Sequence, residues 1–375
     1  MMPLILVLIL AMGAVVLHRL NATKFKDDTA NEYRFMRPSE MAKECLHHAG
    51  IKTRGMSPMQ WATHAMQAPP ATFVGQIPIE TLSAPGMMST SDFPYILANV
   101  NSKYMLEAYA EVEATWKQLS RQRNATDFKT QYPLLVSAAE TFDLIAEGGE
   151  YKYGAFTESR ESYAVKTYGK VYSFTRQMLI NDDMNVFSDI SFAQGQAAAR
   201  TEANLWWLLV TSNPIMADGQ AVFSAAHTNL VAVGTAISND SLSVARAMVA
   251  KQTGMRGEDL NMTPAYIVTP PDKFGLARVF TTPVQATEAG KINLWTDLIP
   301  ISENRLGRAS ATAWYIASAG ASNPPSIVHA YIEGQEGVYQ ESRVGFNPDG
   351  IEFKARIDFG CAWVSHRGWV KNNGA

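Results

Sequence analysis

The stretch GGEYKYGAFTESRESYAVKTYGKVYSFTRQMLI, residues 148–180, carries the strongest fold signal in the chain. Aromatic and β-branched residues alternate largely with polar ones from Tyr151 to Tyr153 and again from Tyr163 to Phe174, which is typical of strands. Between these parts, AFTESRE at residues 155–161 is rich in charges and contains Ser159, as expected of a solvent-exposed connection. The stretch therefore predicts a projecting hairpin of two strands.

The residues that follow predict one long helix. Asn181, Asp182 and Asp183 offer side-chain oxygens to the free amides of a helix start. Residues 185–211 then place apolar side chains at spacings of three, four and seven around an alanine-rich centre, and Asn213-Pro214 ends the pattern. At 1.5 Å per residue this helix is about 40 Å long, which is more than a compact domain usually needs. We expect it to be a spine.

Composition limits the classes of function. The chain has 375 residues, of which 47% are hydrophobic and 18% charged, which is enough for a large core and for two or three subdomains. The 32 basic and 35 acidic residues give a net charge of −3, so no global charge favours nucleic-acid binding. Cys45 and Cys361 alone make neither a metal cluster nor a disulfide framework, which is consistent with a reducing compartment.

The N-terminal region combines an apolar run with a proline-rich stretch. The apolar run Pro3–Leu17 is shorter than the roughly 20 residues of a membrane span and has no basic residue before it. Three interpretations stay open: a short membrane or export segment, a piece removed during maturation, or a misassigned start. The proline-rich residues 67–91 predict a linker or an extended arm, and we place the main boundary there.

Three further regions have a readable pattern. Residues 39–50 and 93–120 are expected to be helical. Between about 241 and 317, helices expected at 241–253 and 272–280 alternate with strands expected at 265–268, 292–300 and 313–316, which favours an α/β subdomain. Residues 327–370 are expected to be rich in strands, with turns at 347–350 and 367–368.

Catalytic motifs are scarce. No Walker A, GxGxxG, HExxH or GxSxG pattern occurs. Ser224, His227 and Asp218 are the only set that resembles a nucleophile with its base, but catalytic triads usually assemble from distant segments. We therefore favour a turn in which Asp218 and His227 form local hydrogen bonds.

Several motifs in register resemble a known family. They are EGGEYKYGAFTESRESYAVKTYGKVYSFTRQMLINDD (147–183), QGQAAARTEANLWWLLVTSNPIMADGQAVFSAAHTNL (194–230) and YIEGQEGVYQESRVGFNPDGIEFKARIDFGCAWVSHRGWVKNNGA (331–375). Their order is similar to that in major capsid proteins of tailed bacteriophages with the HK97 fold, in particular the Mu-like major head subunits. The resemblance covers about residues 90–375.

The resemblance implies an α+β, HK97-like fold with a defined division of the chain. Residues 1–67 would be removed or act as scaffold, and 68–135 would form the N-terminal arm and a helix. Residues 136–180 would form the extended hairpin, called the E-loop, and 181–240 the peripheral domain with the spine helix. Residues 241–324 would form the axial domain, and 325–375 would return to the peripheral domain.

The implied function is structural, without catalytic residues, cofactor, metal or small-molecule substrate. The chain would form pentamers and hexamers of an icosahedral virion shell, assembled in the host bacterial cytoplasm around double-stranded DNA that it contacts without sequence specificity. Further partners would be a portal, a scaffold or maturation protease, and decoration proteins. The intersubunit ion-pair candidates, each of which could equally be a solvated charge, are Glu147, Glu150, Glu158, Arg160, Glu161 and Arg176.

Two alternatives stay open. An encapsulin-type compartment would share the shell fold but enclose a cargo enzyme. An exported hydrolase would use Ser224 and His227, with the apolar N-terminus as its signal.

Overall fold

The computed structural model describes residues 38–48, 52–57, 60–61, 93–133, 135–136, 158–159, 161–175, 184–282, 294–345 and 350–375. The contacts divide the chain into two compact units. The first unit comprises Met1–Glu113, Thr167–Arg200 and Gly337–Ile357, and the second comprises Ala114–Lys166, Thr201–Glu336 and Asp358–Ala375. Both units contain helices and strands, so the predicted α+β class is confirmed.

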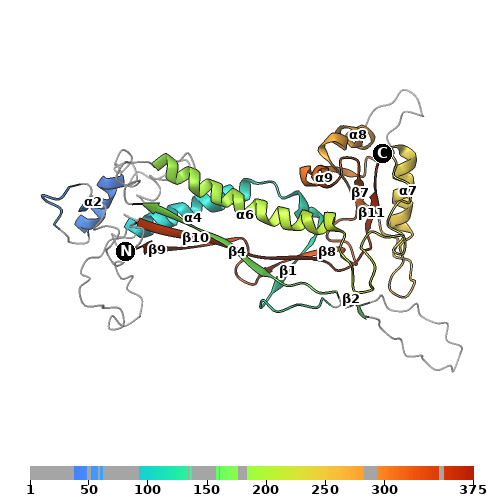
Figure 1. Cartoon of the computed structure of the whole chain (residues 1–375), viewed down its shortest axis with the longest axis horizontal. Helices are drawn as coiled ribbons and strands as arrows, with labels where there is room; N and C mark the ends of the chain where they lie inside the picture. Colours follow the sequence, from blue (N-terminus) through green and yellow to red (C-terminus); the bar gives the residue numbers. More distant parts are fainter. Residues whose placement is uncertain are drawn as a thin grey trace, which may run out of the picture. The chain divides into compact units, whose positions relative to one another are not determined.

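Helix α6, Met184–Ser212, is the longest helix of the described residues (Figure 1). Its 29 residues span about 44 Å at 1.5 Å per residue, in agreement with the spine predicted at 185–211. Asn213 follows it with a φ of 47°, a left-handed conformation that Asn tolerates better than most residues. Residues 184–200 belong to the first unit and 201–212 to the second, so one helix contributes to both.

The first unit contains two further helices, α2 (Pro38–His48) and α4 (Phe93–Glu111). Helix α4 packs closely on α6 at Gly195, where an added Cβ would overlap the carbonyl oxygen of Met105 and lie 2.9 Å from the Cβ of Ala108. Nearby, the rings of Tyr104 and Phe192 lie 5.9 Å apart. Only glycine allows the two backbones this distance.

The antiparallel hairpin of β9 (Val338–Gly345) and β10 (Gly350–Trp363) has a charged face in the first unit. Three cross-strand pairs lie directly opposite one another: Arg343 with Glu352, Glu341 with Lys354, and the Tyr339 ring with the guanidinium of Arg356. Phe353, at an alternate position of β10, is fully buried. The hairpin therefore shows the period of two expected of a strand with one solvated face. Strand β4, Lys166–Thr175, is the other neighbour of β10.

The second unit contributes to two sheets. In the first, β1 (Arg121–Ala125) runs parallel to β8 (Ile327–Ile332), and β8 pairs antiparallel with the last residues of β10. The second sheet has the order β11-β7-β5-β6, and its strands are β11 (Trp369–Asn372), β7 (Trp314–Ala317), β5 (Tyr266–Thr269) and β6 (Ile299–Ser302). Helix α8, Pro271–Thr281, connects the parallel strands β5 and β6 as a crossover.

The two faces of this second sheet cover different cores. On one face, α7 (Asn239–Ala250) and α8 pack on residues such as Ile267, Ile316 and Val370. On the other face, Val268 and Tyr315 join an aromatic cluster with α6, the 3₁₀ helix η3 (Thr115–Leu119) and α9 (Asn304–Ala309). The tryptophans of this cluster are Trp116, Trp206, Trp207, Trp363 and Trp369.

Some predicted elements differ from the structure. Glu158–Ser159, predicted to lie in an exposed connection, form strand β3, which pairs with β2 (Leu135–Val136). Alternation along one stretch does not reveal a partner some 20 residues upstream. The strand predicted at 292–300 is wrong for residues 294–298, since β6 begins at Ile299 after a turn. The helix predicted at 93–120 ends at Glu111, and η3 follows as a separate turn.

The close approach of α4 and α6 predicts opposite effects for two helical glycines. Gly195→Ala is expected to lower the free energy of unfolding by about 2 kcal/mol or more, because the new Cβ meets backbone that cannot move freely. Gly275→Ala in α8 is expected to raise it by about 0.5–1 kcal/mol, since an added Cβ there has no atom within 4 Å. Urea unfolding of unassembled subunits measures both. Equal effects of the two substitutions would contradict the packing.

Candidate functional site

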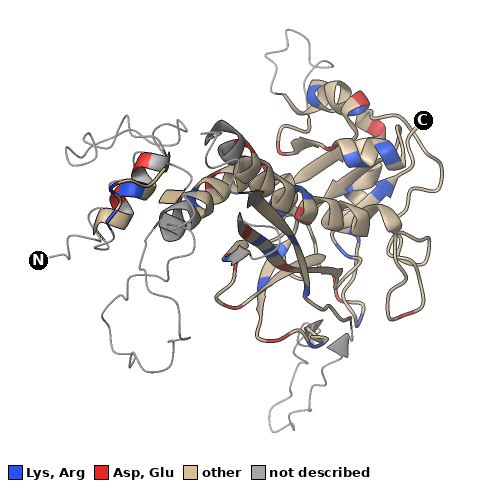
Figure 2. Ribbon diagram, turned by 60° about the vertical axis from the view of Figure 1, so that its left-hand side comes forward, with Lys and Arg blue, Asp and Glu red and all other residues tan. Residues whose placement is uncertain are grey.

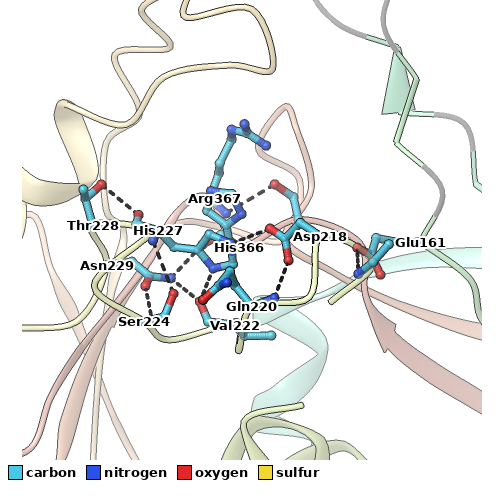
Figure 3. A network of polar contacts seen from close by, with 12 residues as sticks. Glu161, Asp218, Gln220, Val222, Ser224, His227, Thr228, Asn229, His366 and Arg367 are labelled. Atoms are coloured by element: carbon cyan, nitrogen blue, oxygen red, sulfur yellow. Dashed lines mark hydrogen bonds and ion pairs between the residues drawn. The ribbon is translucent and has the colours of Figure 1, made fainter. Parts of the chain in front are cut away.

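The loop between α6 and α7 carries the polar motif noted in the sequence, and short-range hydrogen bonds fix its shape (Figure 3). The Asn213 side chain donates to the carbonyl of Phe223 at 3.1 Å and accepts from the amide of Phe223 at 2.7 Å. Asp218 Oδ1 accepts from the Gln220 amide at 2.9 Å, and Gly219 takes a φ of 81°. These contacts form a compact turn, as the Asp-Gly sequence predicts.

His227 lies at the centre of this turn with a side chain that is 6% exposed. Its Nδ1 lies 2.9 Å from the carbonyl oxygen of Val222, and its Nε2 lies 2.6 Å from Oδ2 of Asp218. Both neighbours accept hydrogen bonds, so both ring nitrogens must donate. Both ring nitrogens of His227 therefore have a hydrogen-bond partner within the turn.

The pKa of Asp218 lies below its ordinary value. Burial raises this pKa, but the hydrogen bond from the Gln220 amide and the bond and charge of His227 together outweigh burial. Because the Asp218 side chain is 48% exposed, solvent screens the ion pair and limits its contribution to stability.

His366, from the turn between β10 and β11, stacks on His227 with ring centroids 3.8 Å apart and planes at 3°. Burial, with smaller contributions from His227 and Arg367, lowers the pKa of His366 to about 3, while Asp218 opposes this shift. His366 is therefore neutral at physiological pH where it stacks on the ring of His227. Arg367 donates from Nε to the carbonyl of Thr253 at 2.6 Å.

Asn229 connects this turn to the C-terminal strands. Its fully buried side chain donates to the carbonyls of Val222 at 2.8 Å and His366 at 3.4 Å, and accepts from the Ser224 amide at 3.1 Å. Its own carbonyl accepts from the Lys371 amide of β11 at 2.9 Å. The loop is thus fixed to the chain end as part of the structural framework.

Ser224 and His227 do not form a nucleophile and base. The Ser224 hydroxyl accepts from the backbone N–H of His227 at 3.3 Å, while both ring nitrogens of His227 are taken up by Asp218 and Val222. No ring nitrogen is left to receive a proton from Ser224. The prediction of local hydrogen bonds between Asp218 and His227 is confirmed, and the hydrolase alternative receives no support from this geometry.

Asp218, His227 and His366 each place one potential metal-ligand atom within 4.8 Å of the others. His and carboxylate ligands suit Zn²⁺. A ligated ion lies close to the plane of each imidazole, however, and two parallel rings 3.8 Å apart cannot both direct a lone pair at one ion without rotation. The arrangement fits an ion pair with a stacked neutral ring better than a metal centre.

Most of the predicted intersubunit and capping residues lie outside the described residues: Glu147, Glu150, Arg160, Arg176, Asn181, Asp182 and Asp183. Glu158 lies in β3. Glu161, predicted in the exposed connection of the hairpin, accepts from the Ala217 amide through Oε1 at 2.9 Å, which joins that connection to the Asp218 turn within one chain (Figure 3). The roles predicted for these residues in contacts between subunits stay predictions.

The sequence did not reveal the parts played by Asn213, Asn229 and His366. Asn229 belongs to the quoted motif, but nothing in its spacing indicated bonds to the chain end. His366 lies 139 positions beyond His227, so only the fold brings the two rings together. A search of the described residues finds no helix long and apolar enough to cross a membrane.

Comparisons with known proteins give one family. A family model described as phage capsid protein matches residues 158–372, more than half of the chain. A search of curated proteins finds no match.

Solved structures with similar folds include the capsid of Ralstonia phage GP4, at 10% identity and a TM-score of 0.48 over 68% of this chain and 87% of that one. The procapsid of bacteriophage JBD30 has 11% identity and a TM-score of 0.43 over 76% of each chain. An encapsulin complex from Synechococcus elongatus has 11% identity and a TM-score of 0.42 over 68% of this chain and 85% of that one.

Two neutral histidines, the buried His329 and the partly buried His366, predict acid sensitivity. Burial and the charge of Lys117 lower the pKa of His329 to about 4, and the pKa of His366 is about 3. Both are neutral in the folded chain, so between pH 6.5 and 4 the unfolded chain binds more protons. As the pH is lowered through this range, the free energy of unfolding should then fall by about 1.4 kcal/mol per pH unit for each histidine.

Urea unfolding of unassembled subunits at several pH values tests this expectation. Above pH 6.5 these two groups contribute no slope. His329→Gln should reduce the slope below pH 6.5 by up to about 1.4 kcal/mol per pH unit, and His366→Gln should do the same independently. An unaltered slope in the His329 variant would contradict the assignment.

The hydrogen bonds of the loop predict that two substitutions lower the free energy of unfolding by different amounts. Asn229→Ala should lower the free energy of unfolding by about 2–4 kcal/mol, because it leaves buried backbone groups without partners. Ser224→Ala should cost less than about 1 kcal/mol, since it removes one long hydrogen bond. Chemical unfolding compares the two variants, and the reverse order would show that the loop is held differently.

Proposed function

Because the chain belongs to the phage capsid protein family, we propose that it is the subunit that forms the pentamers and hexamers of an icosahedral head around double-stranded DNA. The observation that carries this proposal is the extent of the family match. It begins at β3 and ends at β11, and so includes α6, both sheets and the Asp218–His227 loop. The resemblance to tailed-phage capsid proteins is confirmed at the family level, and the Mu-like branch stays a prediction.

The proposal assigns roles to the regions predicted from the sequence. Residues 136–180 would be the E-loop, 181–240 and 325–375 the peripheral domain, and 241–324 the axial domain. The sheet β11-β7-β5-β6 with α7 and α8 has a core of its own on one face, which supports this assignment, although its other face shares the aromatic cluster with α6 in one compact unit. Since β11 pairs with β7, we extend this domain to include residues 369–372.

DNA contact would be weak and independent of sequence. Figure 2 shows Lys and Arg interspersed with Asp and Glu along the described chain, and the net charge of the sequence is −3. Phosphate contacts depend on local basic side chains and weaken as salt increases. We therefore expect bound DNA to be released at high salt without any preference for sequence.

The remaining partners follow from the same proposal. A portal, a scaffold or maturation protease, and decoration proteins would assemble with the shell in the host bacterial cytoplasm. A cleavage in the proline-rich stretch between Ala68 and Ser91 would remove the preceding residues during maturation, and mass spectrometry of purified particles would reveal the new N-terminus.

An encapsulin-type compartment is the second candidate. It would use the same fold and self-assembly, but its lumen would hold a protein cargo. Nuclease-protected DNA in purified particles favours the head, and a stoichiometric protein cargo favours the compartment.

Assembly of the purified full-length chain tests the proposal. Electron microscopy and size-exclusion chromatography with light scattering should show shells or ring-shaped capsomers, because a major capsid subunit associates with itself. If the chain stays a monodisperse monomer over a wide range of concentration and salt, and a version that begins at Thr90 does the same, self-assembly is not its intrinsic property.

A further inference from the structure

Strand β9 has one edge that no other strand of the described chain covers. It pairs with β10 from Val338 to Gly345, and β10 is its only neighbour in the sheet among the described residues. On the far side of β9, the backbone N–H and C=O groups therefore point away from the sheet. An open edge of eight residues is a place where another strand can add.

The middle of β9 is also open on both of its faces. Helix α4 lies close to β9, with the ring of Tyr109 beside Gly337 at the start of the strand. Further along, Glu341, Ser342 and Arg343 are exposed one after another. Successive residues of a strand point to opposite faces, so the described residues cover neither face at these three positions.

Both edges of the second sheet, in contrast, are closed. The amides of Ile299 and Glu303 bond toward β5, so the alternate residue Pro300 of β6 faces outward, where it has no N–H to offer. At the other edge, Leu230 forms a bridge with Lys371 of β11. Strand β9 contains no proline, and no such bridge is formed with it within the described chain.

The charges of β9 have an order that suits a strand partner. Glu341 pairs with Lys354 of β10, and Arg343 pairs with Glu352. Glu341 is still 44% exposed and Arg343 79% exposed, so each can contact a second charge on the open side. Because Glu341 and Arg343 are two residues apart, they lie on the same face of the strand.

This order is its own complement when two copies of β9 run antiparallel. With a two-fold axis perpendicular to the sheet at Ser342, each Glu341 lies opposite Arg343 of the other copy. An axis at Glu341 or at Arg343 would put like charges opposite each other, which is unfavourable. An axis between two residues would set the charged face of one strand beside the opposite face of the other. One register is therefore favoured.

We propose that β9 of one copy pairs antiparallel with β9 of a second copy about a two-fold axis at Ser342. Along the charged face, Lys354 and Glu341 of one copy would continue into Arg343 and Glu352 of the other, with alternating sign across four strands. Charges on an edge often prevent pairing, but here their order selects a second copy of this chain. A two-fold contact ends at two copies. That it joins one ring of the shell to the next rests on the proposed function.

Cysteine crosslinking tests the two-fold axis. The experiment uses full-length chains in which Cys45→Ser and Cys361→Ala leave no native thiol, in a background shown to assemble as the parent does. Opposite Cα atoms of antiparallel strands lie about 4.5–5.5 Å apart, within the range of a disulfide. Ser342→Cys should therefore give a crosslinked dimer under mild oxidation, and nothing larger.

Tyr339→Cys is the matched control in the same strand. Tyr339 is 42% exposed, but in the proposed register its two copies are six residues apart along the strands, or about 20 Å. This variant should not crosslink. Equal crosslinking of Tyr339→Cys and Ser342→Cys, or none of Ser342→Cys, would overturn the proposed register.

Charge complementation tests the same contact without cysteines. Glu341→Arg alone and Arg343→Glu alone each bring like charges together at both opposed positions, and each should raise the concentration needed for assembly by about 5- to 10-fold. An equal mixture of the two variants restores opposite charges at both positions and should recover most of this loss. Changes within each chain are the same alone and mixed, so recovery reports only on the contact between copies.

The outcomes separate this inference from the proposed function. Shells that form without the Ser342→Cys crosslink and without recovery in the mixture would overturn the β9 contact and leave the proposed function intact. Crosslinked dimers from a parent chain that never forms shells or capsomers would support the contact and contradict the proposed function.

Discussion

The second unit depends on the packing of tryptophans against the C-terminal half of α6. Trp206 and Trp207 lie with ring centroids 4.7 Å apart, and Trp206 also lies 6.2 Å from both Trp116 and Trp369. These rings come from segments far apart in the sequence and join both sheets to one helix. Within the described chain, the indole N–H groups of Trp206, Trp207 and Trp369 have no hydrogen-bond partner. Apolar area and ring geometry therefore hold this core together.

The loop after α6 complements this core with polar contacts. Asn213 fixes the start of the loop, and Asn229 joins its end to the carbonyl of His366 and the amide of Lys371. The ring of His227 bonds to Asp218 in the same loop and stacks on the neutral ring of His366. The residues Asp218, Ser224 and His227, which resemble a hydrolase triad in the sequence, thus stabilise the shape of the loop through hydrogen bonds. Its hydrogen bonds occupy both ring nitrogens of His227, so neither is free to accept a proton from Ser224.

The sequence predicted the helices more accurately than the strands. Helix α6 was predicted to within a residue at each end, because its periodicity, its polar start and Asn213-Pro214 agree with one another. Strand β3 was missed because strand pairing depends on a partner far along the chain, here Leu135–Val136. The same reason hid the stacking of His366 on His227. The local bond between Asp218 and His227 was predictable, since both residues lie in one turn.

The division of α6 and β10 between the two units constrains how the family can vary. Successive side chains of a helix point about 100° apart around its axis, and successive side chains of a strand point to opposite faces. Loss or gain of a single residue in 184–212 or 350–363 would therefore move the side chains beyond it to another face of the helix or strand. Length in these two elements should be inherited as strictly as any side chain. Insertions and deletions among relatives should concentrate in the connections between elements.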